Sequence, residues 1–148
     1  METAFISLGS NLDHPIEHVL EAASQMDNLE STKVCNLSSL YKTIPIGPQN
    51  QNDYINAVAI IETNLTPTDL LSTLQGIEKK HRRKRGIKWG PRSLDLDILL
   101  FGKLVLRTRD LIIPHRELVK REFVLIPLLE VTNHDFIIPN YGKIKKYL

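Results

Sequence analysis

The stretch from residue 94 to residue 101, LDLDILLF, has the composition and length of a buried β-strand. A helix precedes it, because residues 66–69 (TPTD) combine an N-cap, a proline at the first helical position and an acid at the third. The apolar stripe of this helix follows at Leu70, Leu74 and Ile77. A helix and a strand in this order indicate a layered α and β protein.

The elements before this pair complete the pattern. Residues 3–8 (TAFISL) have strand composition and end at Gly9, while residues 33–43 and 54–63 also favour extended structure. The segment between the latter two, residues 44–53, has the sequence IPIGPQNQND, which is typical of a long loop.

A first helix lies between the first two strands. Asp13 is the expected N-cap, Pro15 falls in the first turn, and the apolar positions recur at helical spacing up to about Met26. The predicted order is therefore βαββαβ, which indicates an α+β protein of the ferredoxin-like arrangement, with two helices on one face of a largely antiparallel sheet. Residues 103–113 favour further strands, and residues 114–131 favour helical pieces interrupted at Pro127.

The composition is that of an ordinary globular domain. The chain has 148 residues, 42% of them hydrophobic and 24% charged, so we expect one domain spanning residues 1–148. Its lone Cys35 excludes an internal disulfide and a four-thiolate zinc site. The longest apolar stretches, such as residues 123–129, are far shorter than the ~20 residues of a spanning helix. We expect a cytoplasmic protein that does not enter membranes.

The basic side chains are concentrated in one segment. Residues 79–92 contain eight of the 19 Lys and Arg side chains and no acid, although the rest of the chain has more acids than bases. Such a segment predicts a local site for a polyanion. Lys79 and Lys80 are better explained by the C-terminal end of a helix, where cations satisfy the helix dipole.

Asp95 and Asp97 form the sharpest local feature. Alternate residues of a strand share a face, so these carboxylates project together with Cα atoms roughly 6.6 Å apart. Aspartate is disfavoured in strands, and two of them repel unless a cation lies between them. A solvated edge strand also explains the pattern. The adjacent basic loop favours the alternative, in which Mg²⁺ joins the two carboxylates to a polyphosphate while arginines bind its other oxygens.

Other candidate residues are weaker when each is taken alone. His115 follows a proline in a turn, where it could donate to a phosphate or cap the next helix. Tyr54 and Asn56 begin a strand after the long polar loop, where a ring and an amide suit a flat heterocycle, although Tyr54 also suits a core. Neither a P-loop nor a GxGxxG motif is present.

The motifs together resemble one enzyme family, 6-hydroxymethyl-7,8-dihydropterin pyrophosphokinase of folate biosynthesis. The resemblance extends along nearly the whole chain. Its blocks are residues 6–11 (ISLGSN), 41–43 (YKT), 47–49 (GPQ), 53–56 (DYIN), 90–97 (GPRSLDLD), 114–115 (PH) and 121–123 (REF). It implies a ferredoxin-like domain that transfers the β,γ-diphosphate of ATP to the pterin hydroxymethyl oxygen and releases AMP.

The resemblance also implies roles for single residues. Asp95 and Asp97 would hold two Mg²⁺ ions brought with ATP, with Arg92 and Arg82 completing the catalytic set. The residues implied to contact ATP are Gln75, Glu78, Lys88, Trp89, Arg92, Ile98, His115 and Arg121. The residues implied to contact the pterin are Thr43, Ile44, Ile46, Tyr54, Asn56, Trp89 and Phe123, with Tyr54 and Phe123 enclosing the ring. Three positions depart from the common family pattern, namely Lys88, Asp110 and Arg116.

The expected partners are the small molecules ATP and 6-hydroxymethyl-7,8-dihydropterin, bound by a monomer. Two other functions fit parts of the sequence. An RNA-binding module also combines a ferredoxin-like sheet with a basic loop, but the sheet lacks exposed aromatic runs and its paired aspartates would repel a phosphate backbone. An ordinary small-molecule kinase would use the same metal and arginine clamp and release ADP.

Overall fold

The fold is built on one antiparallel sheet. The computed structural model describes residues 1–43, 53–84 and 93–148. Three long strands form most of the sheet, β1 (Glu2–Ser10), β4 (Tyr54–Thr63) and β5 (Leu94–Phe101). β2 (Thr32–Leu37) and β3 (Tyr41–Thr43) both pair with β4, and the order across the sheet is β2-β4-β1-β5. Every pair in it is antiparallel.

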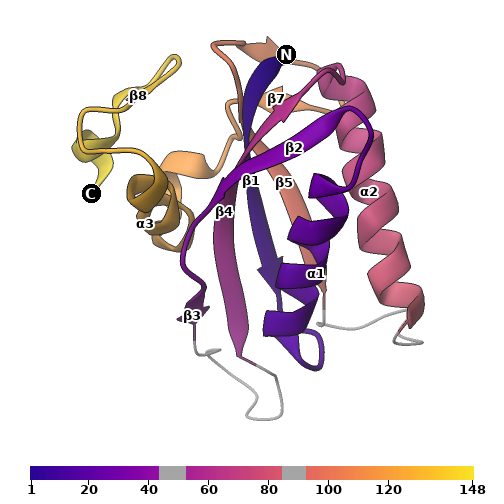
Figure 1. Cartoon of the computed structure of the whole chain (residues 1–148). Coiled ribbons are helices and arrows are strands. Elements are labelled where there is room, and N and C mark those ends of the chain that lie inside the picture. Colours follow the sequence, from indigo (N-terminus) through magenta and orange to yellow (C-terminus); the bar gives the residue numbers. More distant parts are fainter. Residues whose placement is uncertain (44–52, 85–92) are drawn as a thin grey trace.

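Two helices cover one face of this sheet. α1 (Pro15–Asp27) and α2 (Pro67–Lys84) lie side by side on the same face, as Figure 1 shows. The predicted cap of α2 is present, because the Asp69 N–H donates to Thr66 Oγ1 at 3.2 Å. α1 differs from expectation at its start. Its N-cap is His14 in a left-handed conformation with φ 58°, one residue after the predicted Asp13, and this turn directs Pro15 into the helix.

The segment predicted as one strand over residues 33–43 forms two strands. Ser38 interrupts it, since its N–H donates to Val58 O and its Oγ accepts from the Val58 N–H, both at 2.9 Å. A side chain thereby takes one place in the ladder, and β2 and β3 pair with opposite ends of β4. The hydrophobic pattern could not predict this break, because it does not show where a serine hydroxyl replaces a main-chain carbonyl as hydrogen-bond acceptor.

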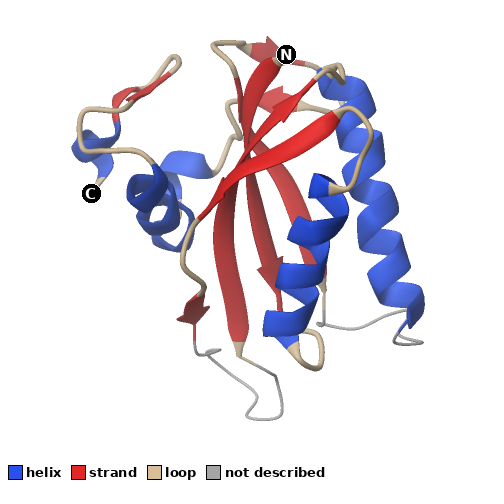
Figure 2. Cartoon of the chain, in the orientation of Figure 1, coloured by secondary structure: helices blue, strands red, loops and turns tan. Residues whose placement is uncertain are grey.

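Most of the C-terminal third covers the opposite face of the sheet, although Leu106, Leu111 and Ile113 pack into the core under α1 and α2. It contains β6 (Leu106–Arg107), β7 (Ile112–Ile113), a 3-10 turn (Leu118–Lys120), α3 (Glu122–Val131), β8 (Ile137–Ile138), β9 (Gly142–Lys143) and a last 3-10 turn (Ile144–Tyr147). Figure 2 shows α3 on the side of the sheet away from α1 and α2. The predicted interruption at Pro127 is wrong. α3 continues through it because Leu125, Pro127 and Leu128 are buried, which outweighs one missing backbone hydrogen bond.

Two hydrophobic cores result, one on each face. Side chains of Ile6, Leu8, Leu74 and Ile98 belong to the core under α1 and α2. Phe5, Val58, Leu99 and Leu125 belong to the core under α3. None of the described helices has both the length and the apolar character needed to cross a bilayer.

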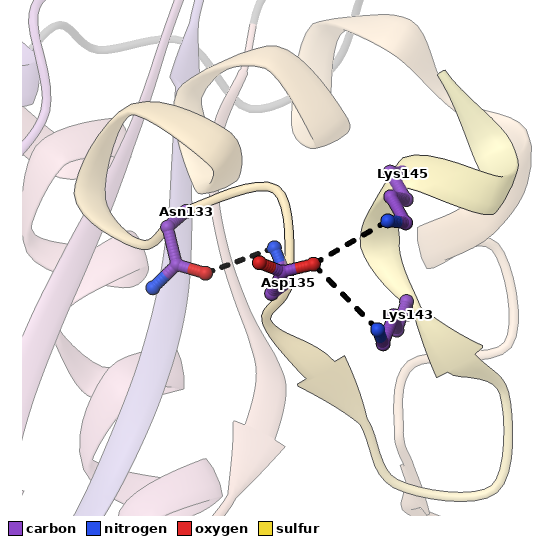
Figure 3. A network of polar contacts seen from close by, with 4 residues as sticks. All are labelled: Asn133, Asp135, Lys143 and Lys145. Atoms are coloured by element: carbon purple, nitrogen blue, oxygen red, sulfur yellow. Dashed lines mark hydrogen bonds and ion pairs between the residues drawn. The ribbon is translucent and has the colours of Figure 1, made fainter.

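A small polar network lies on the surface of the C-terminal segment. Asp135 Oδ1 accepts from Lys145 Nζ at 3.4 Å and pairs with Lys143 Nζ at 3.6 Å, while the Asp135 N–H donates to Asn133 Oδ1 at 2.9 Å (Figure 3). The two lysines lower the pKa of the exposed Asp135 carboxyl. Because the pair is exposed, its contribution to stability is small, and burial of Ile138 and Ile144 anchors the segment.

Candidate active site

Asp95 and Asp97 lie on the sheet face opposite α1 and α2. Their neighbours Leu94, Leu96 and Ile98 alternate with them and enter the core under the two helices. Both aspartates are half-buried, and they stand beside Gly9 and Ser7 of β1 respectively. The same face of β4 carries Tyr54 and Asn56, since Asn56 also pairs with Gly9. The sequence prediction that the two carboxylates share one face is confirmed.

Tyr54 crosses the middle strand to reach Asp95. Its hydroxyl donates to Asp95 Oδ2 at 2.7 Å, and the Ser93 hydroxyl donates to the same oxygen at 2.8 Å. Within the described residues, Asp95 Oδ1 has no hydrogen bond. Burial, followed by the charge of Asp95, raises the pKa of Tyr54 well above its ordinary value, so the phenol stays a donor at neutral pH.

Gly9 is the residue that makes this crossing possible. A Cβ atom there would lie 2.6 Å from Tyr54 Cε1, which is closer than real Cβ atoms approach, and 3.1 Å from Asn56 Oδ1, which is a tight contact. The Tyr54 ring therefore packs directly on the Gly9 backbone. The sequence analysis placed Gly9 only at the end of the first strand and within the family motif of residues 6–11. A glycine at a strand position is the signal that a close approach was needed.

Asp97 has a different environment from Asp95. Burial is the largest cause that raises the pKa of its carboxyl, and the negative charge of Asp95 adds to it. His115 and Arg121 act in the opposite direction, which places both side chains within electrostatic reach of Asp97. The pKa of His115 is itself lowered, mainly by burial. The Glu117 N–H donates to His115 Nδ1 at 3.1 Å, so the neutral imidazole carries its proton on Nε2.

Glu78 fixes the strand between the two aspartates. Its Oε2 accepts the Leu96 N–H at 2.8 Å at the outer edge of β5, where no further strand of the described sheet pairs. Burial raises the pKa of this half-buried carboxyl. Arg82, one turn further along α2, is exposed and close enough to lower it. α2 thereby contributes an acid and a base to the edge of the site.

A pocket of about 270 Å³ lies between β3 and the first half of α3. Its walls include two residues that the resemblance assigns to the pterin, Thr43 and Phe123. Thr43 pairs with Tyr54, which joins the pocket to the aspartate face of the sheet. Asn56 is 5% exposed, and its side-chain amide makes no hydrogen bond to the described residues, so the amide is available to a ligand.

The remaining predicted site residues have diverse positions. Gln75 is exposed on α2, one turn from Glu78. The Ile98 side chain is buried in the core, so a contact from Ile98 to a nucleotide has to use its main chain at the edge of β5. Five predicted residues lie outside the described part of the chain, namely Ile44, Ile46, Lys88, Trp89 and Arg92. Ser93 was missed as a site residue because a hydroxyl at a strand start has no distinctive pattern.

This arrangement gathers two carboxylates, a tyrosine and an asparagine on one face of an antiparallel sheet, with a histidine and an arginine within electrostatic reach of Asp97. The chain matches the family model described as 7,8-dihydro-6-hydroxymethylpterin-pyrophosphokinase (HPPK) over residues 5–133. The protein therefore belongs to this family, as its sequence motifs predicted.

Relatives from several bacteria agree with this assignment. A protein of Haemophilus influenzae named 2-amino-4-hydroxy-6-hydroxymethyldihydropteridine pyrophosphokinase is 48% identical over 140 residues, which cover 95% of this chain and 87% of the relative. A protein of the same name from Pseudomonas aeruginosa is 43% identical, covering 88% of this chain and 81% of its own.

Solved structures resemble the fold at much lower identity. The HPPK-DHPS protein of Plasmodium falciparum, crystallised with pteroate, superposes with a TM-score of 0.74 at 14% identity. The match covers 99% of this chain and 41% of that one, so this chain spans about two fifths of the solved chain. The likeness concerns the fold, and it confirms a mixed α and β architecture with an antiparallel sheet.

Proposed function

We propose that this protein transfers the β,γ-diphosphate of ATP to the hydroxymethyl oxygen of 6-hydroxymethyl-7,8-dihydropterin, giving the pterin diphosphate and AMP in folate biosynthesis. One structural observation carries the proposal beyond family membership. Asp95 and Asp97 share one face of the sheet with Tyr54 and Asn56, and Tyr54 pairs with Thr43, which lines a pocket together with Phe123. An anion-and-metal region thus adjoins a region suited to a flat heterocycle.

The two aspartates fit Mg²⁺. Hard carboxylate oxygens are the ligands that Mg²⁺ prefers, and one or two of them together with substrate phosphates usually hold it. Asp95 receives both protein donors on Oδ2, which leaves Oδ1 directed to no described partner. Burial raises the pKa of the Asp97 carboxyl by more than His115 and Arg121 lower it, so a bound cation would further stabilise its ionised form. When bound, Mg²⁺ would neutralise phosphate charge and orient the transferred group.

The chain's own residues supply further charge and position. A polyphosphate opposes attack by a neutral alcohol through its negative charge, so basic side chains near it lower the barrier. Arg121 and His115 lie within electrostatic reach of Asp97, and Arg82 lies within electrostatic reach of Glu78 at the edge of β5. We propose that these groups bind the phosphates. Contacts from Lys88, Trp89 and Arg92, which lie outside the described residues, remain predictions.

The pterin end of the proposal depends on three described residues. Asn56 offers two donors and one acceptor, which match the amide-like edge of a pterin. Phe123 is 41% exposed on the pocket wall, where a large apolar ring is available for stacking. Tyr54 cannot serve as a base, because its raised pKa keeps the hydroxyl protonated. It positions Asp95 and offers its ring to the ligand.

Several coarser features accompany this function. We propose that the βαββαβ frame is a ferredoxin-like one, which the strand order β2-β4-β1-β5 supports, and that residues 1–148 act as one domain. We further propose a monomer that works on ATP and the pterin, without nucleic acid, in the cytoplasm. The single cysteine suits a reducing compartment.

A nucleotide-product assay tests the reaction. The full chain is incubated with ATP, Mg²⁺ and 6-hydroxymethyl-7,8-dihydropterin, and the products are separated by chromatography. We expect AMP and pterin diphosphate in equal amounts, with no product after metal removal. Release of ADP would contradict diphosphate transfer, and binding of RNA with steep salt dependence but no turnover would favour the RNA-binding alternative.

A further inference from the structure

A second cluster of ligating side chains lies on the other side of the sheet, between α1 and α2. His18, Glu21 and Gln25 occupy positions i, i+3 and i+7 of α1, so they share one helix face. His81 of α2 meets this face. Its Nδ1 lies 2.7 Å from His18 Nδ1, and its Nε2 lies 2.7 Å from Gln25 Oε1. One ligand atom each from His18, Glu21 and His81 lies within 4.8 Å of the others.

We propose that His18, Glu21 and His81 form a binding site for one divalent transition-metal ion of the zinc class. Two imidazoles and one carboxylate are a frequent protein ligand set for Zn²⁺, and they leave a fourth position for water. Mg²⁺ and Ca²⁺ prefer all-oxygen sites, so the nitrogen donors select against them. Among the described residues, this is the one group in which three such side chains converge.

The hydrogen bonds around His81 prepare it to bind a metal. The Gln25 carbonyl can only accept, so His81 Nε2 carries the proton and His81 Nδ1 presents a lone pair toward His18. This is the arrangement in which a neighbouring acceptor fixes the tautomer of a ligating histidine. In the metal-free protein, His18 Nδ1 donates the proton shared between the two rings.

A metal ion would occupy the place of that shared proton. His18 stays neutral when its proton resides on Nε2, so both Nδ1 atoms offer lone pairs and no proton need leave the pair. Zn–N bonds of 2.0–2.1 Å at a tetrahedral angle separate two nitrogens by about 3.3 Å, so the 2.7 Å contact has to open by about 0.6 Å. Small side-chain rotations suffice for such a movement.

Burial makes the cluster a selective site. His18 and His81 are only 6% and 1% exposed, so water competes poorly for their nitrogens. Glu21 is half-buried and brings one negative charge to a divalent ion. The site is independent of the aspartate pair, because α1 and α2 cover the face opposite Asp95 and Asp97 (Figure 1). Its ion would join the beginning of α1 to α2 one residue before Arg82.

Cobalt spectroscopy tests the site without reference to catalysis. The metal-free full chain is titrated with Co²⁺ in excess Mg²⁺, which occupies oxygen sites, and the visible absorption of four-coordinate Co²⁺ is followed. We expect one ion per chain, with the band bleached by Zn²⁺. His18→Ala and His81→Ala should abolish the band, and Gln25→Ala should weaken binding about tenfold. The exposed His134→Ala is the matched control and should bind as the wild type does.

Two further variants keep the test decisive if a buried histidine variant does not fold. Glu21→Gln preserves shape and should weaken Co²⁺ binding at least tenfold, and Zn²⁺ should raise the melting temperature of the wild type but not of Glu21→Gln. A Co²⁺ spectrum that is only six-coordinate would overturn the proposal. So would binding that survives the His18 and Glu21 changes, or binding that is lost in Asp95→Asn, since the ion would then belong to the active site.

Discussion

Tyr54 on β4 donates a 2.7 Å hydrogen bond to Asp95 on β5, across the glycine of the strand between them. The three strands are thereby tied together at the end of the sheet where the site lies. The contact requires that Gly9 have no side chain, because the Tyr54 ring fills the space in which a Cβ would stand. The packing of the Tyr54 ring and the position of Asp95 in the site therefore both depend on the glycine at position 9.

Replacing this glycine should disturb the site directly. In Gly9→Ala the new methyl group would lie 2.6 Å from Tyr54 Cε1, so the ring has to move away from Asp95. We expect a loss of stability of about 1–3 kcal/mol, as for other overpacked sites, together with lower turnover. Urea denaturation and the nucleotide-product assay measure the two effects.

The matched control is Gly76→Ala. Apart from its chain neighbours and the backbone of α2 itself, no atom of the described residues lies within 4 Å of the place where the Cβ of an alanine at Gly76 would stand. Alanine favours helices, so this variant should be more stable by about 0.5–1 kcal/mol with turnover unchanged. Equal effects of the two substitutions would contradict the role given to Gly9.

Asp97→Asn should separate stability from activity. Burial raises the pKa of the Asp97 carboxyl in the folded protein, so the native state binds more protons than the unfolded state just above pH 3.8. The ionised carboxylate therefore destabilises the metal-free fold at neutral pH. We expect Asp97→Asn to melt at a higher temperature than the wild type in chelator at pH 7, with turnover lower by on the order of 10²–10³-fold.

The difference in melting temperature between Asp97→Asn and the wild type should depend on pH. Below about pH 3.8 both proteins carry a neutral side chain at position 97, so the difference in melting temperature should vanish. Thermal denaturation across pH measures it. Asp110→Asn, at an exposed position, is the control and should match the wild type in stability. A variant at position 97 that is less stable than the wild type at pH 7 would show that the carboxylate is compensated in the metal-free state.

Glu78→Ala should loosen β5 between the two aspartates. The variant leaves the Leu96 N–H without its acceptor at the sheet edge. We expect exchange of the Leu96 amide with solvent to accelerate roughly tenfold, which corresponds to one hydrogen bond of about 1–1.5 kcal/mol. Glu78→Gln retains a carbonyl acceptor and should restore most of the protection. Amide exchange measured by NMR compares the variants, and unchanged exchange in Glu78→Ala would contradict the contact.

Glu130→Ala should free β3 from α3. The Glu130 carboxylate accepts from the Ser39 N–H at 3.0 Å, the Ser39 hydroxyl at 2.8 Å and the Tyr41 hydroxyl at 2.5 Å. The hydrogen bond from Tyr41 is the main cause that lowers the pKa of Glu130. Because the group is exposed, we expect a loss of only about 1 kcal/mol at pH 7.

This loss has a defined pH window. A lowered pKa in the folded state gives stability above the ordinary value of 4.5, and this stability is lost as the pH falls through the lowered pKa. The difference between wild type and Glu130→Ala should therefore disappear in acid. The pKa of Tyr41, which the Glu130 hydrogen bond raises, should fall in the variant, as ultraviolet titration can follow. A tyrosine titration identical in both proteins would contradict the contact.

The sequence predicted most of the regular elements. The strand from Leu94 to Phe101 and the strand from Tyr54 to Thr63 have the predicted bounds, and α2 begins with its predicted cap. These elements were predictable because periodicity, turn residues and caps are local properties of the chain. The break at Ser38 and the continuation of α3 through Pro127 were not, since each depends on a partner distant in sequence.

The amino-acid sequence by itself determined that Asp95 and Asp97 share a face, because side chains alternate along any strand. It also determined family membership, through motifs whose order and spacing are linear properties. Only the tertiary structure decided which face that is, that Tyr54 reaches Asp95 over Gly9, and that His18 meets His81 between two helices. Such contacts join residues 41 and 63 positions apart, and their geometry follows from strand register and helix packing.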